Sequence, residues 1–336
     1  MDEYFKNKTV LITGGTGSFG KAAVKKFLKI KKIKKIIIFS RDELKQHELS
    51  QTYNLYEKKK LRFFIGDVRD YKRFEMASRN VDYIIHAAAL KQVPTAEYNP
   101  FEFIKTNIMG AQNIIEASMK NNVKKVIALS TDKASSPINL YGATKLCSDK
   151  LFVSANNLVG HDKLSFSVIR YGNVAGSRGS VIPIFLNQRK NNKFEITDPN
   201  MTRFNITLDE SLKFVFRCIK LSVGGEIFIP KIPSYKILDL AKVINEKAKI
   251  KFIGIRPGEK IHEEMISRYE SFNSYEGKDI YFILPNYNLK KYGNLIKKLK
   301  AKKVKQNFIY SSGNNIFMNY NELKKLIHSV ESNMDT

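Results

Sequence analysis

Acid–base groups recur at short spacings in the segment STDKASSPINLYGATK, residues 130–145. Tyr141 and Lys145 are four residues apart, so on a helix they share one face and the lysine can reach the tyrosine hydroxyl. A positive charge beside a phenol lowers its pKa, which lets the tyrosine accept a proton from a hydroxyl group. Just upstream, Asp132 and Lys133 form an acid–base pair that, taken alone, is more often a surface ion pair. The segment therefore predicts proton-transfer chemistry only if the fold turns it toward a ligand.

Short apolar runs alternate with helix-like stretches through the first half of the chain. This alternation indicates crossover connections and a parallel sheet covered on both faces. The expected fold class is α/β, a doubly wound parallel (Rossmann) sheet with residue 131 at the carboxyl end of one strand. The expected elements are a strand and helix over 8–29, strands at 33–40, 61–67, 81–89, 123–131 and 164–174, and a helix over 101–121.

After about residue 175 the pattern loosens into turns and short helices, as expected of a smaller α/β lobe that closes over a ligand. The run GGEIFIP (224–230) is typical of a late strand. We therefore expect a dinucleotide-binding domain over 1–174 and a mainly substrate-binding lobe over 175–336. The two are expected to be partly interleaved, because about 205–230 returns to the main sheet.

Gly14, Gly17 and Gly20 lie between the first strand and the first helix, in TGGTGSFG. Without side chains they let the backbone turn sharply, so that the helix amino terminus can face a pyrophosphate. Glycines alone also occur in ordinary strand-to-helix turns, but here strand, helix and sheet are all expected, which favours dinucleotide binding. The expected cofactor contacts are Gly14, Thr16, Gly17, Ser18, Phe19, Gly20, Ser40, Arg41, Lys45, Asp67, Val68, Ala87, Ala88, Ala89, Asn107, Tyr141 and Lys145.

The end of the second strand, FSRDELK, bears on which dinucleotide binds. Ser40, Arg41 and Lys45 favour NADP, because an arginine there accommodates a ribose 2′-phosphate. Asp42 leaves NAD open, because an acid there holds the 2′-hydroxyl instead. Asp67, in GDVRD, suits the adenine edge, although an exposed loop acid would look the same.

Composition and charge exclude several classes of protein. The net charge is +26, from 58 Lys+Arg against 32 Asp+Glu, but the lysines are dispersed along the chain, which is typical of solvated faces and not of a nucleic-acid-binding module. Cys147 and Cys218 are far apart and form no metal-binding motif, so no metal site is expected and a reducing cytoplasm fits. No signal peptide and no membrane span is expected either. We expect a cytoplasmic protein that binds neither nucleic acid nor membrane.

Several motifs together carry a resemblance over nearly the whole chain. The TGGTGSFG turn, HAAA (86–89) and the YxxxK pair resemble the extended short-chain dehydrogenase/reductase (SDR) superfamily, in its nucleotide-sugar-modifying branch. Within it, STDK, LKQVP, YGNVAGSRGSVIPIF, MTRF, GGEIFIPKIPS and RPGEKIHEEM closely resemble the configuration-inverting UDP-N-acetylglucosamine 4,6-dehydratases. These enzymes begin pseudaminic acid synthesis in bacteria that glycosylate their flagellins.

The resemblance implies a mechanism for the Asp132–Lys133 pair. Retaining dehydratases carry Asp-Glu at this place, and Lys133 in the Glu position matches the inverting group. By this resemblance Tyr141, with Lys145 beside it, removes the C4 hydroxyl proton while hydride passes to NADP, which stays bound and is regenerated each turn. Lys133, if neutral, could then take the C5 proton while Asp132 protonates the departing C6 hydroxyl, although Tyr141 could also serve at C5.

Substrate contacts and assembly follow from the same resemblance. A planar guanidinium can hold phosphate oxygens with two hydrogen bonds, which makes arginines candidates for the diphosphate or uracil end of UDP-N-acetylglucosamine. A homo-oligomer such as a hexamer is expected. The candidate substrate contacts are Lys91, Thr131, Asn173, Arg178, Arg203, Arg256 and Glu259.

Two other functions stay open. A UDP-hexose 4-epimerase would share the cofactor site and YxxxK, but it needs no acid–base pair at Asp132 and Lys133. A non-catalytic NADP-binding or basic binding protein would have no use for Tyr141 and Lys145 as a hydride-transfer pair. Enzymatic activity that does not depend on salt, together with undetectable RNA binding, would exclude the non-catalytic binding protein.

Overall fold

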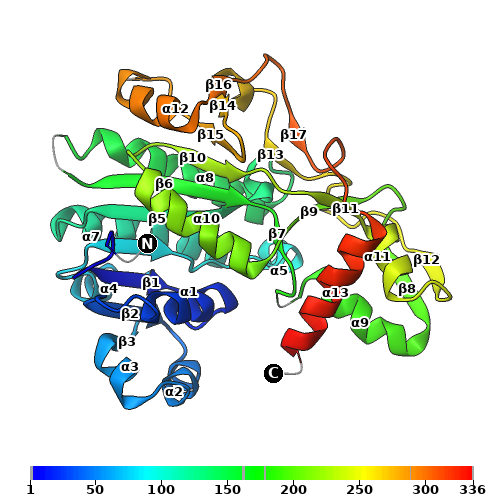
Figure 1. Cartoon of the computed structure of the whole chain (residues 1–336), viewed down its shortest axis with the longest axis horizontal. Helices are drawn as coiled ribbons and strands as arrows, with labels where there is room; N and C mark the ends of the chain where they lie inside the picture. The colour runs from blue at the N-terminus through cyan, green and yellow to red at the C-terminus, as the bar shows by residue number, and fades with distance from the viewer. Residues whose placement is uncertain (1–2, 161–162, 178, 288, 335–336) are drawn as a thin grey trace.

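A ten-stranded sheet forms the centre of the molecule in a computed structural model that describes residues 3–160, 163–177, 179–287 and 289–334. Its strands are β1 (Thr9–Thr13), β2 (Lys35–Ser40), β3 (Leu61–Ile65), β4 (Tyr83–His86), β5 (Lys125–Thr131), β6 (Ser165–Tyr171), β10 (Ile227–Pro230), β14 (Ser274–Glu276), β15 (Ile280–Ile283) and β16 (Lys302–Lys303). They lie in the order β16-β14-β15-β10-β6-β5-β4-β1-β2-β3 (Figure 1). The seven strands from β10 to β3 run parallel, which confirms the doubly wound sheet.

The central parallel strands are buried on both faces, whereas the edge strand β3 exposes Arg62 and Ile65. Every residue of β1, β4, β6 and β10 is buried, which explains why these segments are almost continuous apolar runs in the sequence. Beyond β10, the antiparallel strands β15, β14 and β16 extend the sheet. The sequence analysis made no prediction for these three strands, which are only two to four residues long.

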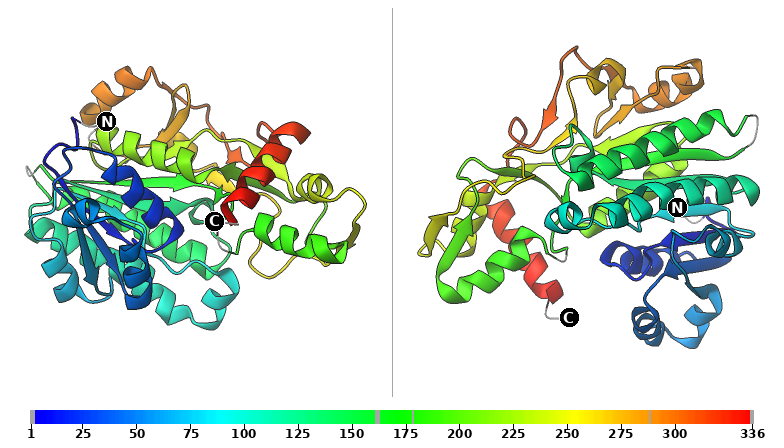
Figure 2. Two further views of the ribbon diagram at one scale, coloured as in Figure 1. Left: turned by 60° about the horizontal axis from the view of Figure 1, so that its bottom comes forward. Right: turned by 180° about the vertical axis from the view of Figure 1, so that it is seen from behind.

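Helices cover the sheet on both faces (Figure 2). One face carries α1 (Ser18–Leu28) and α10 (Leu208–Leu221), where the rings of Phe27 and Phe216 lie 4.4 Å apart. The other carries α4 (Tyr71–Ala77), α7 (Gly110–Lys120) and α8 (Leu140–Ser154). Shorter helical segments link these elements: α2 (Glu43–Gln51), α3 (Leu55–Lys60), α5 (Val93–Tyr98), α6 (Pro100–Phe103) and a π-helical turn (Ile104–Met109).

A smaller α/β lobe packs beside the carboxyl ends of the parallel strands. Its apolar core is built from α9 (Val181–Gln188), β8 (Lys193–Ile196), α11 (Ile237–Ile244) and the C-terminal helix α13 (Tyr320–Met334), with β12 (Lys249–Phe252) paired to β8. Val330 of α13 lies against Gly176, so the last helix supports the loop that enters α9. The lysine-rich C-terminal segment, from about residue 286, had no role from the sequence alone; its last helix completes this lobe, whereas β16 extends the main sheet.

Short strands connect the two parts. A three-stranded sheet joins β7 (Asn173–Val174), β9 (Thr202–Ile206) and β11 (Ser234–Lys236), and β13 (Glu264–Ile266) pairs with β17 (Tyr310–Ser311). Helix α12 (Gly293–Leu299) follows β15. The chain passes between the parts several times, with β10 in the main sheet after β9 in the smaller one. The domain boundary at residue 174 stays a prediction.

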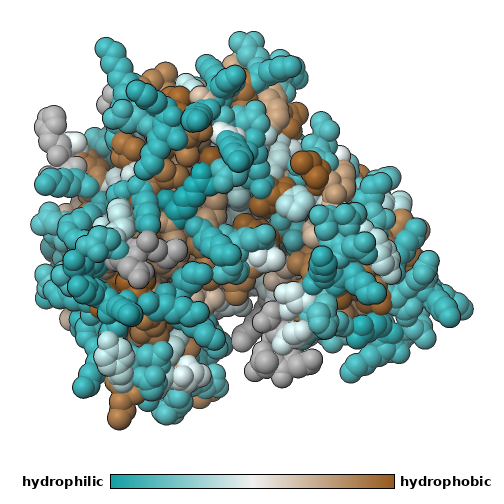
Figure 3. All heavy atoms as spheres, in the orientation of Figure 1, coloured by the Kyte–Doolittle hydropathy of each residue, from teal (hydrophilic) through white to brown (hydrophobic). Residues whose placement is uncertain are grey.

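The face of the molecule in Figure 3 is mostly hydrophilic, with apolar side chains scattered between the polar ones. This distribution agrees with lysines that are spread along the sequence. Within the described ranges, none of the helices has the length and apolar character needed to span a bilayer.

Candidate active site

A cleft of about 1110 Å³ lies at the carboxyl ends of the parallel strands, between the sheet and the smaller lobe. The strand order changes direction at β1, with β2 and β3 on one side and β4, β5 and β6 on the other. Ligands of open α/β sheets bind at such a switch point, because the loops diverge there and leave a crevice. The loops after β1, β2, β4, β5 and β6 all line this cleft.

The glycine turn after β1 is shaped for close approach of a ligand. Gly14 has φ +65°, and a Cβ there would lie 3.0 Å from the amide nitrogen of Ala88. At Gly20, a Cβ would lie 2.5 Å from the Cα of Gly15. Helix α1 begins at Ser18, its N-cap Gly17 makes no side-chain cap, and no acid occupies its first turn, so its amide groups can meet an anion. These features fit the pyrophosphate of a dinucleotide.

A buried pair that the sequence analysis did not single out, Thr13 and His86, positions the opposite wall. The amides of Ala87 and Ala88 both donate to Thr13 Oγ1 at 3.1 Å. The hydroxyl proton of Thr13 is therefore free to go to His86 Nδ1, 2.8 Å away, which must be the unprotonated nitrogen. Burial, with Lys145 nearby, lowers the pKa of His86 to about 3. This neutral histidine thus holds the HAAA loop through Thr13.

The candidate ribose-binding residues at and after the end of β2 have different hydrogen-bond partners. Ser40 is buried and accepts a hydrogen bond from Gln46 Nε2 at 2.9 Å. Asp42 caps helix α2, accepting from the Lys45 amide at 2.9 Å, and also pairs with the Lys45 side chain. Arg41 remains half exposed, with Nη1 3.7 Å from Asp67 Oδ2. Asp42 and Arg41 both line the cleft, but the acid that left NAD open is already engaged as the cap of α2 and by Lys45.

The predicted cofactor contacts line the cleft with one exception. Asn107 is buried in the π-helical turn and does not line it. Its side chain accepts from the Leu90 amide, and donates to the Leu90 carbonyl and to Thr144 Oγ1, all at 3.0 Å. In this structure Asn107 therefore braces the loop after β4 instead of touching the cleft. Asp67 lines the cleft, but its carboxylate is held by Arg69 Nε at 2.9 Å.

Tyr141 and Lys145 both face the cleft from α8, which begins after Asn139, its N-cap. Burial raises the pKa of Tyr141 to about 12, although the charge of Lys133 and the Thr131 hydroxyl act to lower it. Lys145 donates to the Leu129 carbonyl at 2.9 Å, and burial lowers its pKa. The charge that acts to lower the pKa of Tyr141 in this structure is therefore that of Lys133, and the lowering expected from Lys145 stays a prediction.

Lys133 lies between two carboxylates, in a group we call the Lys133 cluster: Asp132, Lys133 and Glu263. Its Nζ is 3.0 Å from Asp132 Oδ1 and 3.1 Å from Glu263 Oε1. Burial alone would lower the pKa of Lys133, but the two carboxylates outweigh it and raise the pKa above its usual value. The condition under which Lys133 could take the C5 proton, a neutral amine, does not fit this geometry, because the two adjacent carboxylates favour the ammonium ion.

Asp132 lies behind the cleft wall and not in it. Its side chain is fully buried, and burial raises its pKa. Oδ1 accepts from Thr131 Oγ1 at 2.9 Å and from Lys133, and in the part of the chain that the structure describes Oδ2 has no hydrogen-bond partner. Thr131 and Lys133 do line the cleft, so a proton on Asp132 reaches a ligand by way of one of them.

Glu263 was missed by the sequence analysis, which chose Glu259 from the same motif. Glu263 is buried, lines the cleft, and also lies 3.9 Å from Arg203 Nε. Burial would raise its pKa, but Lys133 and Arg203 lower it, so the carboxylate is ionised. It lies 130 residues after Lys133, and no local spacing indicates such a contact.

A second buried group, the Arg170 cluster, lies next to the first and consists of Asp149, Arg170 and Glu270. Arg170 Nη1 donates to Glu270 Oε1 at 2.9 Å and to the Met265 carbonyl at 2.9 Å, and Nη2 donates to Asp149 Oδ2 at 3.3 Å. Asp149 follows Lys145 by one helical turn on α8. Ser135, three residues after Asp132, donates from its Oγ to Glu270 at 3.1 Å. The two clusters are therefore adjacent.

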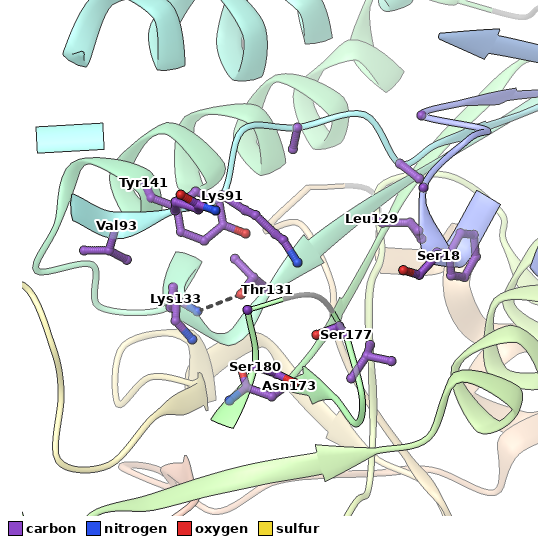
Figure 4. Close-up of a pocket in the computed structure, with 18 of the residues that line it drawn as sticks. Ser18, Lys91, Val93, Leu129, Thr131, Lys133, Tyr141, Asn173, Ser177 and Ser180 are labelled. Carbon is purple, nitrogen blue, oxygen red and sulfur yellow. Dashed lines mark hydrogen bonds between the residues drawn. The ribbon is translucent and has the colours of Figure 1, made fainter. Parts of the chain in front are cut away.

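The predicted substrate contacts lie around the remaining part of the cleft. Figure 4 shows Lys91, Thr131, Lys133 and Tyr141 lining the pocket together with Asn173. Arg203 lines the cleft as well, but its Nη1 donates to the Thr202 and Ile261 carbonyls.

At the outer part of the cleft, Arg256 lies 3.8 Å from Glu259, and both residues line the cleft. Arg178 lies outside the described residues. No group of three or more His, Cys, Asp or Glu that could hold a metal ion occurs in the ranges that the structure describes.

Comparison with known proteins gives the family of the chain. The model of the family described as polysaccharide biosynthesis protein matches residues 10–285. A Campylobacter jejuni (serotype O:23/36, strain 81-176) protein named UDP-N-acetylglucosamine 4,6-dehydratase (inverting) is 55% identical over 317 residues, covering 93% of this chain and 94% of that protein. A Rickettsia bellii (strain OSU 85-389) protein named UDP-glucose 4-epimerase is 45% identical, covering 97% of each.

A solved structure shows the same fold. Pen from Bacillus thuringiensis superposes with a TM-score of 0.88 at 40% identity, covering 98% of this chain and 99% of that chain. The match extends through the sheet, the cleft and the smaller lobe, because nearly the full length of both chains is covered. The chain belongs to the polysaccharide biosynthesis protein family, within the extended short-chain dehydrogenases/reductases.

Proposed function

We propose that the chain is a UDP-N-acetylglucosamine 4,6-dehydratase that inverts C5 and produces UDP-2-acetamido-2,6-dideoxy-β-L-arabino-hex-4-ulose. The observation that carries the proposal is Lys133, next to Asp132 at the end of β5, facing the same cleft as Tyr141. An epimerase needs one base for the C4 hydroxyl, whereas loss of water across C5 and C6 also needs groups that handle a C5 proton and a departing C6 oxygen. The similarity to the Campylobacter jejuni protein supports the same reading.

The first step falls to the pair on α8. A bound nicotinamide dinucleotide supplies the acceptance and the later return of a hydride. Tyr141, which burial keeps protonated, takes the proton of the C4 hydroxyl as it passes its own phenol proton through the Thr131 hydroxyl to Asp132, and the charge of Lys133 favours the phenolate. Lys145 lines the same side of the cleft, where its Nζ is held by a hydrogen bond to the Leu129 carbonyl. The resulting ketone makes the C5 proton acidic.

The second step falls to the Lys133 cluster. Asp132, whose pKa is raised by burial, is suited to deliver a proton to the departing C6 hydroxyl through Lys133 or Thr131. Inversion requires that the C5 proton leaves from one face of the sugar and returns to the other. Tyr141, once it has passed the C4 proton through Thr131 to Asp132, takes the C5 proton from one face. Lys133 begins as an ammonium ion, so we assign to it the return of a proton to the other face of C5, after which the proton on Asp132 restores the ammonium ion.

The cofactor that we propose is NADP, tightly bound and regenerated at each turnover. Arg41 faces the cleft beside the end of β2, where a 2′-phosphate would lie, and Asp42 is engaged as the cap of α2. The family resemblance supports the remaining parts of the proposal. We propose that the protein is cytoplasmic and forms a homo-oligomer, such as a hexamer. Its reaction would begin pseudaminic acid synthesis for flagellin glycosylation.

A second candidate is a UDP-glucose 4-epimerase, favoured by the 45% identity to the Rickettsia bellii protein. Mass spectrometry of the reaction separates the two functions. The dehydratase converts UDP-N-acetylglucosamine to a product lighter by one water, whereas the epimerase leaves the mass of either UDP-N-acetylglucosamine or UDP-glucose unchanged. Isomerisation of UDP-glucose without loss of water from UDP-N-acetylglucosamine would overturn the dehydratase proposal.

A further inference from the structure

Glu263 reaches Lys133 from a rigid segment of the smaller part of the chain. The residue lies directly before β13, and its backbone is held by Ser312: the Glu263 amide donates to Ser312 Oγ at 2.9 Å, and the Ser312 amide donates to the Glu263 carbonyl at 2.8 Å. Ser312 Oγ lies 2.8 Å from Thr202 Oγ1. These hydrogen bonds hold the backbone from which the Glu263 carboxylate extends toward Lys133.

Lys133 balances the charge of this carboxylate. The Glu263 side chain is 3% exposed, and Oε1 lies 3.1 Å from Lys133 Nζ. Arg203 Nε is further away, at 3.9 Å, and Oε2 has no hydrogen-bond partner among the residues described. A buried carboxylate is costly unless a cation compensates it, so Glu263 and Lys133 depend on each other.

The other charges around Lys133 differ in sign and come from several elements. Asp132 precedes Lys133 in the chain, and Tyr141 faces it from α8. The cations Lys91 after β4, Arg203 on β9 and Lys260 before β13 also act on the cluster. These three cations oppose the protonation of Lys133. Against them, Asp132 supplies one negative charge that favours it. Glu263 supplies the second negative charge.

We propose that Glu263 is a positioning residue, which keeps Lys133 protonated and fixed at the cleft wall so that Lys133 enters the reaction as a proton donor. The step that uses this proton rests on the proposed function. The contact between Glu263 and Lys133 and the charge state of Lys133 are independent of the proposed function. The direction of the Lys133 pKa, raised by Asp132 and Glu263 against the effect of burial, agrees with the geometry.

The test compares Glu263→Gln with Glu264→Gln in the full-length protein. Gln keeps the shape of the side chain and removes its charge. The neighbouring Glu264 accepts from the exposed Ser136 hydroxyl at 3.0 Å and acts on Lys260, and it forms no ion pair with Lys133 among the residues described. Each variant is labelled with a trace of acetic anhydride across a pH series, and modification of Lys133 is measured by peptide mass spectrometry. Because only the neutral amine reacts, the midpoint gives the pKa of Lys133 without substrate or turnover.

The expected result is a fall of the Lys133 midpoint by about one pH unit or more in Glu263→Gln, with no change in Glu264→Gln. The alkaline limb of the pH–rate profile for water loss should move to lower pH by the same amount. An unchanged midpoint in Glu263→Gln overturns the proposal, whether or not the protein is a dehydratase. If that variant does not fold, Glu263→Asp, which draws the charge back by one methylene, should lower the midpoint partway; an unchanged midpoint there overturns the proposal equally.

Discussion

The Lys133 cluster and the Arg170 cluster have the same ingredients, one cation between two carboxylates, yet they differ in what surrounds them. Arg170 is fully buried and donates to two carboxylates and to the Met265 carbonyl, and Glu270 also accepts from Ser135 and Ser267. The Lys133 side chain is 21% exposed and lines the cleft. One cluster is closed off from solvent, and the other opens to a ligand.

This difference teaches which buried charges can take part in chemistry. A proton can pass from a protein group to a ligand only where the group, or a hydrogen-bonded neighbour, reaches the ligand. Lys133 and Thr131 meet this condition and connect Asp132 to the cleft. The Arg170 cluster instead ties β6 and α8 to the segment around Glu270. We therefore expect loss of the first cluster to reduce activity and loss of the second to reduce stability.

The largest expected effect is on catalysis. Lys133→Met should lower the rate of water loss by about 10²–10⁴-fold, because it removes the proton donor. The variant should lose some stability but remain folded, since Asp132, with its pKa already raised by burial, can take up a proton and Arg203 Nε still lies 3.9 Å from Glu263. Product formation is followed by mass spectrometry, with Lys105→Met, an exposed lysine paired with Glu102, as the control. A Lys133→Met enzyme with normal turnover would remove Lys133 from the mechanism.

Breaking the Arg170 cluster should have its main effect on folding. Arg170→Met leaves two carboxylates without their cation in the interior, which costs about 3–5 kcal/mol of unfolding free energy. Arg189→Met, which breaks an exposed pair with Glu331, should cost less than about 1 kcal/mol. Urea unfolding of both variants measures the difference. If Arg170→Met is no less stable than Arg189→Met, the assigned structural role is wrong.

The pH dependence of stability sharpens the same contrast. Burial would raise the pKa of Glu270, but the charge of Arg170 and the hydrogen bonds from Ser267 lower it below its ordinary value. The folded protein therefore binds fewer protons at Glu270 than the unfolded chain does. Its contribution is complete above the ordinary glutamate pKa of about 4.3 and is lost as the pH falls through the lower folded value.

Glu270→Gln should remove that contribution. Unfolding free energies measured in urea across acidic pH should then fall less steeply on acidification than in the wild type. Glu331→Gln, at the exposed partner of Arg189, serves as the control and should keep the wild-type slope. Equal slopes in wild type and Glu270→Gln would contradict the inferred state of Glu270.

The smallest effect is expected at an exposed ion pair. Arg41→Ala should weaken NADP binding by about tenfold or more, as expected for loss of a charged hydrogen bond, and leave NAD binding and stability nearly unchanged. Arg69 shares Asp67 with Arg41 but does not line the cleft, so Arg69→Ala is the matched control. Calorimetric titration with both dinucleotides measures the effect. Equal losses for NADP and NAD would argue against a 2′-phosphate contact.

The parts of the fold that the sequence predicts are those with a strong local pattern. The buried parallel strands are continuous apolar runs bounded by turns, so β1 to β6 were expected close to where they lie. Strands β14 and β16 have three and two residues, too short to carry a period; β14 pairs with the edge of β15, and β16 pairs with β14. Helix α13 is amphipathic, but only the folded lobe shows which core it completes.

The candidate site divides in the same way. Tyr141, Lys145, Asp132 and Lys133 were predicted because their chemistry is visible in one short segment. The charge state of Lys133 was not, because it depends on Glu263, 130 residues away. Likewise, Asn107 was expected at the cofactor, but its side chain is taken up by Leu90 and Thr144. Spacing identifies groups that can react, while tertiary contacts decide their protonation and their partners.

The most direct test is proton NMR of the purified protein with UDP-N-acetylglucosamine in deuterated water, without added cofactor. A cleft in which Tyr141 and the Lys133 cluster act together predicts a new 6-methyl signal, deuterium at C5 and the coupling constants of an inverted ring. Persistence of the 6-methylene signals while a 4-epimer accumulates would contradict the assignment and identify an epimerase instead.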